Sequence, residues 1–304
     1  MPLLKRWIPL LGLWLLGGAQ AASCGQFGLT VNSPSVLKAV EHKVGCTFTS
    51  TRWFVDWNRP FPSAQARALL AESGRQLELS WQPRLVKVSK TKTSYVGVPY
   101  RVIAAGGYDA YVRRFARDVR ATGRSVAITF APEMNGDWGV YQLSAKNTPQ
   151  DFKHAWTRLH RIFRQEKANV RWVWAPNIIY PTARASYGAL YPGDAYVDEV
   201  GLDGYNWGTT HTWNRWKSFA QTFDASYRAV KALTGKPIQL GELSSVEQGG
   251  NKAEWIRDMC RQLPNYPRVR KVFWFHVLDG KVDWRLTTST AALKAFQSCI
   301  KIKP

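Results

Sequence analysis

The chain has 304 residues, 45% of them hydrophobic, and a formal net charge of +21. This length suits one large domain or two small ones, and no linker, low-complexity tract or solenoid-type repeat divides the sequence. The charge would attract acidic polysaccharide, lipopolysaccharide or nucleic acid, or would serve solubility only. Because the basic residues are spread out and form no nucleic-acid-binding motif, the sequence argues against a nucleic-acid partner.

The first 21 residues are typical of an export signal. A positive start at Lys5 and Arg6 precedes the apolar stretch 7–16, and a small-x-small cleavage site ends at Ala21. A membrane anchor is the alternative, but the apolar run is shorter than the roughly 20 residues that span a bilayer. Cleavage predicts a secreted or periplasmic chain 22–304 without a transmembrane segment, and it lowers the net charge to +19.

The mature chain keeps four cysteines, Cys24, Cys46, Cys260 and Cys299. An even count in an exported protein indicates disulfides. Three pairings are possible, and we favour Cys24–Cys46 with Cys260–Cys299 because each ties one terminal segment to its neighbour. No Cys-x-x-Cys or His-x-x-x-His spacing indicates a metal site, and we expect no metal and no organic cofactor.

Short apolar runs rich in β-formers alternate with amphipathic segments along the mature chain. Strands are predicted at 27–31, 48–55, 76–81, 125–131, 169–174, 197–202, 237–240 and 269–275. Helices are predicted from residue 35 and at 63–72, 108–121, 149–165, 216–233, 252–262 and 291–298. Eight such units predict an α/β protein, a single-domain (β/α)8 TIM barrel. An open doubly wound sheet is the alternative, but it would want a Gly-rich phosphate loop after an early strand, and the sequence has none there.

Active-site residues of such barrels lie at the C-terminal ends of the strands. Glu133 follows the fourth predicted strand and Glu242 the seventh, so both should face the barrel mouth from opposite sides. Hydrolysis of a glycosidic bond needs two such carboxyl groups, one to protonate the leaving oxygen and one to attack or to activate water. The pair predicts a glycoside hydrolase. Asp56, Asp194 and Asp203 compete for either role on position alone, and a lone Glu can be a surface charge or a helix cap.

Aromatic and polar residues follow or end several other predicted strands. Aromatic faces suit the apolar C–H faces of sugar rings, and the chain has 15 Trp residues. The expected substrate-binding residues are Trp81, Trp138, Trp174, Asn177, Asp203, Tyr205, Trp207, Trp274 and His276. The alternative for many of the Trp side chains is a structural place between barrel and helices.

Five segments carry a family resemblance: 133–138, 172–177, 191–198, 200–206 and 236–242. Together they resemble glycoside hydrolase family 26, the group of β-mannanases and related β-glucanases and β-xylanases, over the chain from about Phe27 to its end. The resemblance implies a retaining mechanism, with Glu133 as acid/base and Glu242 as nucleophile. It also implies sugar contacts from Trp138, Tyr205 and Trp274. In addition, Tyr205 would hydrogen-bond the nucleophile and Asp203 would bind or orient near the cleavage site.

Two positions depart from the family's mannanases. Pro132 stands where those enzymes usually have His, and Thr129 where many have Arg. Since those groups help to recognise the sugar at the cleavage point, the departures put mannan specificity in question. The resemblance favours a β-mannan or β-glucan as substrate of an endo-acting enzyme, whereas the positive charge favours an acidic envelope exopolysaccharide.

A second class of function is a non-catalytic barrel that binds polysaccharide for exopolysaccharide assembly or retention. The presence of both glutamates favours the enzyme, whereas Pro132 and Thr129 keep the binding protein as an alternative. In either class we expect a monomer whose partner is a polysaccharide or an acidic envelope surface.

Overall fold

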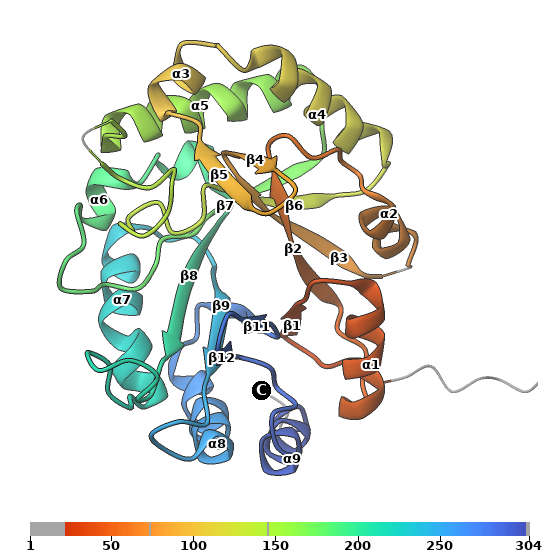
Figure 1. Ribbon diagram of the computed structural model, residues 1–304, viewed down its shortest axis with the longest axis vertical. Coiled ribbons are helices and arrows are strands. Elements are labelled where there is room, and N and C mark those ends of the chain that lie inside the picture. The colour runs from red at the N-terminus through yellow and green to blue at the C-terminus, as the bar shows by residue number, and fades with distance from the viewer. Residues whose placement is uncertain (1–21, 73, 145, 302–304) are drawn as a thin grey trace, which may run out of the picture.

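A closed barrel of eight parallel strands forms the centre of the computed structural model, which describes residues 22–72, 74–144 and 146–301 (Figure 1). Around the ring the strands follow the order β1-β10-β9-β8-β7-β6-β3-β2. Their bounds are β1 Phe27–Thr30, β2 Ser50–Asp56, β3 Gln76–Gln82, β6 Val126–Phe130, β7 Val170–Trp174, β8 Glu199–Asn206, β9 Ile238–Ser245 and β10 Val269–Phe275. The predicted TIM barrel is confirmed, whereas the predicted leader 1–21 and its cleavage site lie outside the described residues.

Helices surround the barrel on the outside (Figure 1). They are α1 Pro34–Val44, α2 Ala64–Ala71, α3 Tyr100–Ala104, α4 Asp109–Ala121, α5 Pro149–Gln165, α6 Tyr187–Leu190, α7 Phe219–Leu233, α8 Lys252–Gln262 and α9 Thr290–Cys299, with the 3-10 turns η1 Asp194–Tyr196 and η2 Leu263–Asn265. Most of the longer helices begin at a Ser, Thr or Asn whose side-chain oxygen accepts a hydrogen bond from the first turn, as Ser218 does for α7. Within the described residues, no helix combines the length and the apolar character needed to cross a membrane.

The apolar core lies between the barrel and the helices. Aromatic side chains fill much of it; for example, Trp57 stacks on Trp81 with ring centroids 4.9 Å apart, and Trp81 stacks on Phe115 at 4.7 Å. Each such buried ring removes on the order of 150–250 Å² from water, so this layer dominates the hydrophobic stabilisation of the fold.

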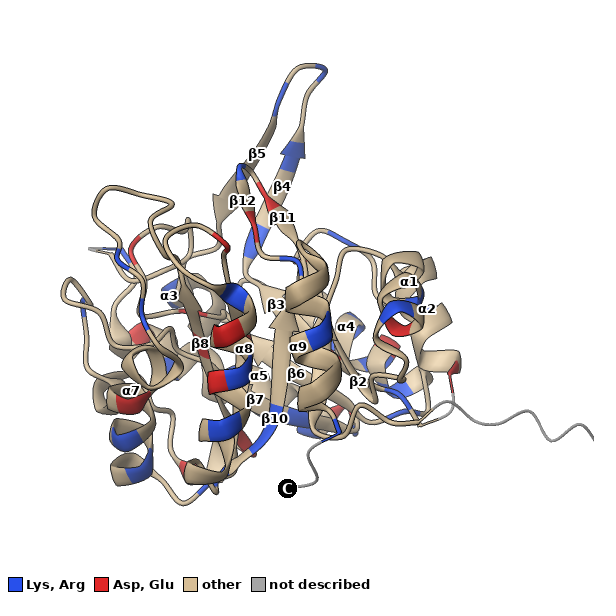
Figure 2. Ribbon diagram, turned by 90° about the horizontal axis from the view of Figure 1, so that it is seen from below, with Lys and Arg blue, Asp and Glu red and all other residues tan. Residues whose placement is uncertain are grey.

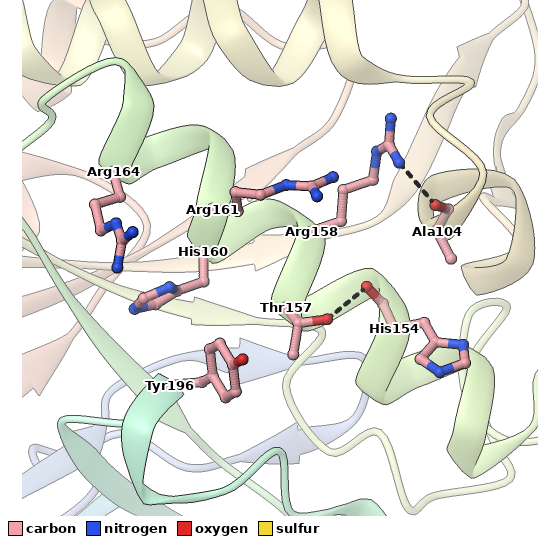
Figure 3. A pocket seen from close by; sticks show the side chains of 8 residues that line it. All are labelled: Ala104, His154, Thr157, Arg158, His160, Arg161, Arg164 and Tyr196. Atoms are coloured by element: carbon pink, nitrogen blue, oxygen red, sulfur yellow. Dashed lines mark hydrogen bonds between the residues drawn. The ribbon is translucent and has the colours of Figure 1, made fainter.

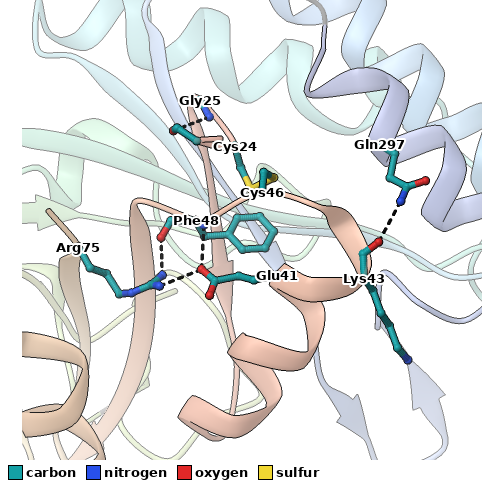
Figure 4. Close-up of a disulfide and its surroundings, with 9 residues drawn as sticks. Cys24, Gly25, Glu41, Lys43, Cys46, Phe48, Arg75 and Gln297 are labelled. Atoms are coloured by element: carbon teal, nitrogen blue, oxygen red, sulfur yellow. Dashed lines mark hydrogen bonds and ion pairs between the residues drawn. A yellow bond between two sulfur atoms is a disulfide. The ribbon is translucent and has the colours of Figure 1, made fainter. Parts of the chain in front are cut away.

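Both predicted disulfides are confirmed. Cys24–Cys46 joins the segment before β1 to the end of α1, and Cys260–Cys299 joins α8 to α9, with Cα–Cα distances of 5.2 and 5.7 Å. Figure 4 shows the first bridge beside Phe48, whose backbone N–H donates to the carboxylate of Glu41 at 2.9 Å. A disulfide that closes a loop of this length stabilises a fold by about 3 kcal/mol, mainly because it lowers the conformational entropy of the unfolded chain.

Several segments differ from the sequence prediction. Strands β8 and β9 run on to Asn206 and Ser245, beyond the predicted ends at 202 and 240, because their polar residues pair with one another across the two strands. The region after β3, for which the sequence predicted neither a strand nor a helix before residue 108, forms a hairpin, β4 Arg84–Val88 and β5 Thr93–Gly97. A second, short hairpin, β11 Leu278–Asp279 and β12 Val282–Asp283, follows β10. Both hairpins stand at the C-terminal end of the barrel strands (Figure 2).

Candidate active site

Glu133 lies just after β6 on a turn with left-handed backbone. Ala131 and Glu133 have φ angles of 50° and 53°, a conformation that costs a non-glycine residue about 1–2 kcal/mol. Backbone hydrogen bonds hold the turn: the N–H of Glu133 donates to the carbonyl of Ala175 at 2.8 Å, and its own carbonyl accepts from the Gln142 side chain at 2.9 Å. This turn fixes the carboxyl group of Glu133 at the mouth of the barrel.

Two neutral donors contact the carboxyl group of Glu133. The side-chain N–H of Asn177 donates to Oε1 at 2.7 Å, and the indole N–H of Trp138 donates to Oε2 at 3.3 Å. Burial and the nearby charge of Glu242 nevertheless raise the pKa of Glu133 to about 7. A carboxyl group with this pKa can hold a proton at neutral pH and give it away.

Glu242 lies inside β9, at a register shift between β8 and β9 that brings it opposite Asp203. Gly241 lies at this shift, and a Cβ there would lie 2.5 Å from Oδ1 of Asp203 and 2.6 Å from Nη2 of Arg52, so the buried side chains leave no room for a larger residue. Arg52 donates to Oε1 of Glu242 at 3.3 Å, and the hydroxyl of Tyr205 donates to Oε2. Burial raises the pKa of Glu242, while Arg52 and Tyr205 oppose that shift.

Arg52 is fully buried below the mouth and contacts three carboxyl groups, those of Glu78, Asp203 and Glu242. Burial works against its charged form, but these carboxyl groups raise the pKa of Arg52 above its ordinary value. Glu78 also accepts from the Gln239 side chain at 2.7 and 2.8 Å. The network fills the barrel interior with polar groups and fixes the cation under Glu242.

Thr129 belongs to this buried network and not to the mouth. Its hydroxyl donates to Glu78 at 3.1 Å and accepts from Arg52 at 3.3 Å, and its side chain is fully buried. Asp203 is fully buried as well, and burial raises its pKa well above the ordinary value. Asp203 therefore lies behind the two glutamates, where it contacts Arg52 at 3.4 Å.

Aromatic side chains form the walls of the mouth. Trp138 is 55% exposed and lies 5.4 Å from the ring of Tyr180 on the Glu133 side. On the Glu242 side, the ring of Trp284 lies 4.8 Å from Tyr205 and 4.7 Å from Trp207. Two carboxyl groups flanked by aromatic rings can accommodate a sugar chain between them.

Comparisons with known proteins show the family of the chain. The model of glycosyl hydrolase family 26 matches residues 97–262, more than half of the chain. The chain belongs to glycosyl hydrolase family 26. The sequence is 33% identical over 278 residues to Endoglucanase H of Acetivibrio thermocellus, covering 89% of this chain and 29% of that protein. It is 28% identical over 197 residues to Beta-1,3-xylanase TXYA of a Vibrio species, covering 60% of this chain and 42% of the relative.

Solved structures show the same fold. The catalytic domain of a Bacillus sp. JAMB-750 GH26 endo-β-1,4-mannanase matches with a TM-score of 0.66 at 18% identity, over 91% of this chain and 86% of that one. The GH26 domain of a Prevotella bryantii endo-β-mannanase/endo-β-glucanase matches with a TM-score of 0.64 at 12% identity, over 93% and 90%. This family 26 chain spans less than half the length of the curated relatives named above.

Four expected substrate-binding residues of this family 26 chain lie away from the mouth. Trp81, Trp174 and Trp274 have no exposed surface and pack in the layer between barrel and helices. His276 is 5% exposed, and its Nδ1 accepts from the backbone of Leu286 at 3.0 Å. The expectation that they contact sugar was wrong for these four, because both faces of a barrel strand are buried and the outward face meets the helices.

The two other competing aspartates are engaged elsewhere. Asp56 accepts from Arg84 at 2.6 Å at the root of the β4–β5 hairpin. Asp194 accepts from Tyr191 and Thr234, both at 2.7 Å, before the start of β8 and therefore at the opposite end of the barrel. The structure brings Glu133, Glu242 and their neighbours together without either aspartate.

Sequence reasoning missed several residues of the family 26 site. The most important are Arg52, which contacts Glu242, and Trp284, which packs against Tyr205. A signal for Arg52 was present, since Arg52 and Glu78 interrupt otherwise apolar or β-forming strands. Charged residues within such strands indicate a polar barrel interior. Trp284 carries no comparable local signal because it comes from the loop after β12.

A separate cavity of about 370 Å³ lies on the outer side of α5 (Figure 3). It is lined by Ala104, His154, Thr157, Arg158, His160, Arg161, Arg164 and Tyr196. Arg158 is committed to Asp109, which it binds through two N–H groups at 2.7 Å. None of the lining residues hydrogen-bonds to either glutamate in the described part of the chain, so this cavity is distinct from the mouth. The described residues also contain no cluster of three or more His, Cys, Asp or Glu suited to a metal ion.

Proposed function

We propose that this chain is a secreted, retaining endo-glycosidase of a β-linked polysaccharide, with Glu133 as acid/base and Glu242 as nucleophile. The observation that carries the proposal is the unequal surroundings of the two carboxyl groups. Glu133 has neutral donors and a pKa of about 7, whereas Glu242 contacts the guanidinium of Arg52 and the hydroxyl of Tyr205. The first environment suits a proton donor and the second an anionic nucleophile.

In the first step, Glu242 attacks the anomeric carbon while Glu133 gives its proton to the leaving glycosidic oxygen. The bond from the anomeric carbon to that oxygen breaks, and a bond to a carboxyl oxygen of Glu242 forms. Arg52 and Tyr205 hold Glu242 in place for this attack, since each contacts a different one of its oxygens. Once its proton has left, Glu133 is an anion stabilised by the donors Asn177 and Trp138.

In the second step, Glu133 takes a proton from water, and the resulting hydroxide attacks the glycosyl-enzyme at the same carbon. The bond to Glu242 breaks, and its carboxylate returns to Arg52 and Tyr205. Two displacements at one carbon leave the product with the configuration of the substrate. The sugar being cleaved would lie between the rings of Trp138 and Trp207, on opposite sides of the mouth.

The proposed substrate class is a β-linked backbone of the mannan or glucan type. The relatives are named as an endoglucanase, a β-1,3-xylanase and a mannan endo-1,4-β-mannosidase, so the family tolerates several backbones. Pro132 and Thr129 add no charged or imidazole group to the mouth. This supports a specificity that differs from that of the mannanases. The two disulfides support function outside the reducing cytoplasm.

The test is hydrolysis of a panel of purified β-mannan, β-glucan and β-xylan, scored by new reducing ends and product length. We expect internal cleavage of at least one polymer, with proton NMR showing that the first product keeps the β configuration. Binding of a polymer without release of reducing ends would instead support the non-catalytic barrel. A first product in the α configuration would overturn Glu242 as nucleophile.

A further inference from the structure

The β4–β5 hairpin is set apart from the rest of the mouth by its shape. Its two strands pair from Arg84↔Gly97 to Val88↔Thr93 and form a sheet separate from the barrel. The hairpin projects beyond the C-terminal end of the barrel strands (Figure 2). The four steps of about 3.3 Å from Arg84 to Val88 carry the end of the paired strands roughly 13 Å beyond the root.

The hairpin is also set apart by its charge. Residues 84–97 include Arg84, Lys87, Lys90 and Lys92 but no Asp or Glu. Arg84 is committed at the root, where it pairs with Asp56 at 2.6 Å and lies 4.0 Å above the ring of Tyr95. The three lysines are exposed and form no ion pair within the described residues, so the outer half of the hairpin is a cationic surface.

Hydrogen bonds fix the root of the hairpin to the barrel. The backbone of Trp57 donates to Arg84 at 3.0 Å, and Asn58 exchanges two hydrogen bonds with Val86 at 2.8 and 2.9 Å. These bonds attach the hairpin to the chain just after β2. The lysines therefore project from a fixed base.

The root of the hairpin also contacts the loop after β6 that carries Glu133 and Trp138. Gly97 lies so close to Val140 that a Cβ on it would be 1.9 Å from the Val140 carbonyl oxygen. Val140 is two residues from Trp138, which donates to Glu133. The root of the hairpin therefore adjoins the loop that carries Trp138.

One exposed apolar side chain shares a face of the hairpin with a lysine. Val96, 43% exposed, lies on the face of Lys87, because their paired positions Leu85↔Val96 and Lys87↔Ser94 are two residues apart, whereas Val88 and Tyr95 lie on the opposite face. An apolar side chain beside ammonium groups fits a sugar chain whose rings carry carboxylates. An anionic lipid surface fits less well, because a membrane seated on the hairpin would cover the mouth that the same loops form.

We propose that residues 87–96 form a cationic arm that binds the acidic substituents of a polysaccharide whose backbone lies in the mouth. The proposal deepens the proposed function and rests on it for turnover, but not for binding. Because the lysines lie well away from the two glutamates, they should affect affinity and KM for an acidic polymer and leave kcat unchanged.

The test compares two triple variants in a Glu242→Ala background, so that binding is measured without hydrolysis. One variant replaces Lys87, Lys90 and Lys92 by Gln. The matched control replaces three other exposed lysines by Gln: Lys43 on α1, Lys294 on α9 and Lys301 just beyond α9. These three form no ion pair within the described residues. The probes are carboxymethylated β-glucan and its unmodified parent, titrated at low and at high salt.

For the arm variant we expect about tenfold weaker binding of the carboxymethylated polymer at low salt, and less than twofold change on the parent. High salt should reduce the difference, since the contacts are exposed. The control triple should change neither polymer's affinity by more than twofold. Equal losses in the two triples would overturn the proposal in favour of net charge, and equal losses on the two polymers would overturn it in favour of apolar contact.

A second measurement separates the remaining explanations. Vesicles containing anionic phospholipid serve as the other probe; loss of vesicle binding without loss of the carboxymethylated polymer would show a membrane-docking arm and overturn the proposal. If the wild-type chain cleaves no polysaccharide while the arm variant still loses affinity selectively, only the proposed hydrolase function fails. Thermal unfolding should be the same in all variants because every substituted lysine is exposed.

Discussion

The two glutamates at the barrel mouth have the same side chain and opposite surroundings. Glu133 sits on a left-handed turn after β6 and receives hydrogen bonds from two neutral donors. Glu242 sits inside β9 above a buried guanidinium. Burial and the charge of Glu242 raise the pKa of Glu133 to about 7, whereas Arg52 and Tyr205 oppose the rise that burial causes at Glu242. The difference teaches that the proposed division of labour would come from the environment of each group.

The two environments also differ in how they are held. Glu242 is held by strand pairing and by a network that reaches through Arg52 to Glu78 at the centre of the barrel. Glu133 depends on loop contacts, among them the carbonyl of Ala175 and the side chain of Gln142. We therefore expect substitutions around Glu242 to affect stability as well as activity, and substitutions around Glu133 to affect mainly the proton transfer.

The largest effect should follow from Glu242→Ala. Without the nucleophile no glycosyl-enzyme forms, and kcat should fall on the order of 10⁴-fold or more, while polymer still binds. Initial rates of reducing-end release and a direct binding titration check this. Turnover within tenfold of wild type would remove Glu242 from the mechanism.

Glu133→Ala should have a large but substrate-dependent effect. General acid catalysis contributes about 10²–10⁴-fold, so polysaccharide cleavage should fall by that factor. Aryl glycosides with good leaving groups need little protonation, and their first step should be nearly unaffected. Rates on the polymer and on a dinitrophenyl glycoside of the same sugar measure the contrast, and equal losses on both would contradict the acid role.

Arg52→Met should test the cation below Glu242. Three buried carboxyl groups, those of Glu78, Asp203 and Glu242, would lose their shared cation, which costs about 3–5 kcal/mol of unfolding free energy. Urea unfolding measures the loss. Arg228→Met is the matched control, because Arg228 pairs with Asp224 at 3.2 Å on the surface with 71% of its side chain exposed and should cost under about 1 kcal/mol. Equal costs for the two variants would contradict the role of the network.

The comparison of the two glutamates also shows how far the sequence could lead. Alternating apolar and amphipathic segments predicted the barrel, and the barrel placed Glu133 and Glu242 at the fourth and seventh strands. Strand ends were predicted too early for β8 and β9, because Asp203, Tyr205 and Glu242 are polar. In the closed barrel these residues lie where strand pairing and the buried Arg52 stabilise them, which no local pattern reveals.

The buried tryptophans show what the sequence pattern could not predict. A strand's period of two tells which residues share a face, but a barrel strand is buried on both faces. Trp274 therefore gave the same local signal whether it faced the mouth or α8 and α9, and it faces the helices, with its ring 6.2 Å from both Trp255 and Phe296. Trp138, by contrast, comes from a loop and not from a strand, and its side chain is 55% exposed at the mouth.

The pKa of Glu133 predicts the pH dependence of the wild-type enzyme. The acid must be protonated in the first step, so a raised pKa extends activity upward to about pH 7 and no further. Above that pH, kcat/KM should fall tenfold per unit as Glu133 loses its proton. A pH–rate profile on the polymer checks this. A fall in kcat/KM that already begins below pH 5 would mean that Glu133 is not desolvated in solution.

The smallest effect should come from Trp138→Phe, which keeps an aromatic wall but removes one donor to Glu133. The indole N–H stabilises the carboxylate form and so lowers the pKa of Glu133; its removal should raise that pKa further. A hydrogen bond worth about 0.5–1 kcal/mol corresponds to roughly half a pH unit, so the basic limb should move upward by that amount. Trp213→Phe is the control, since Trp213 is 72% exposed and stacks on His211 instead. A downward shift for Trp138→Phe, or the same shift in the control, would show that the loop and not the hydrogen bond tunes the acid.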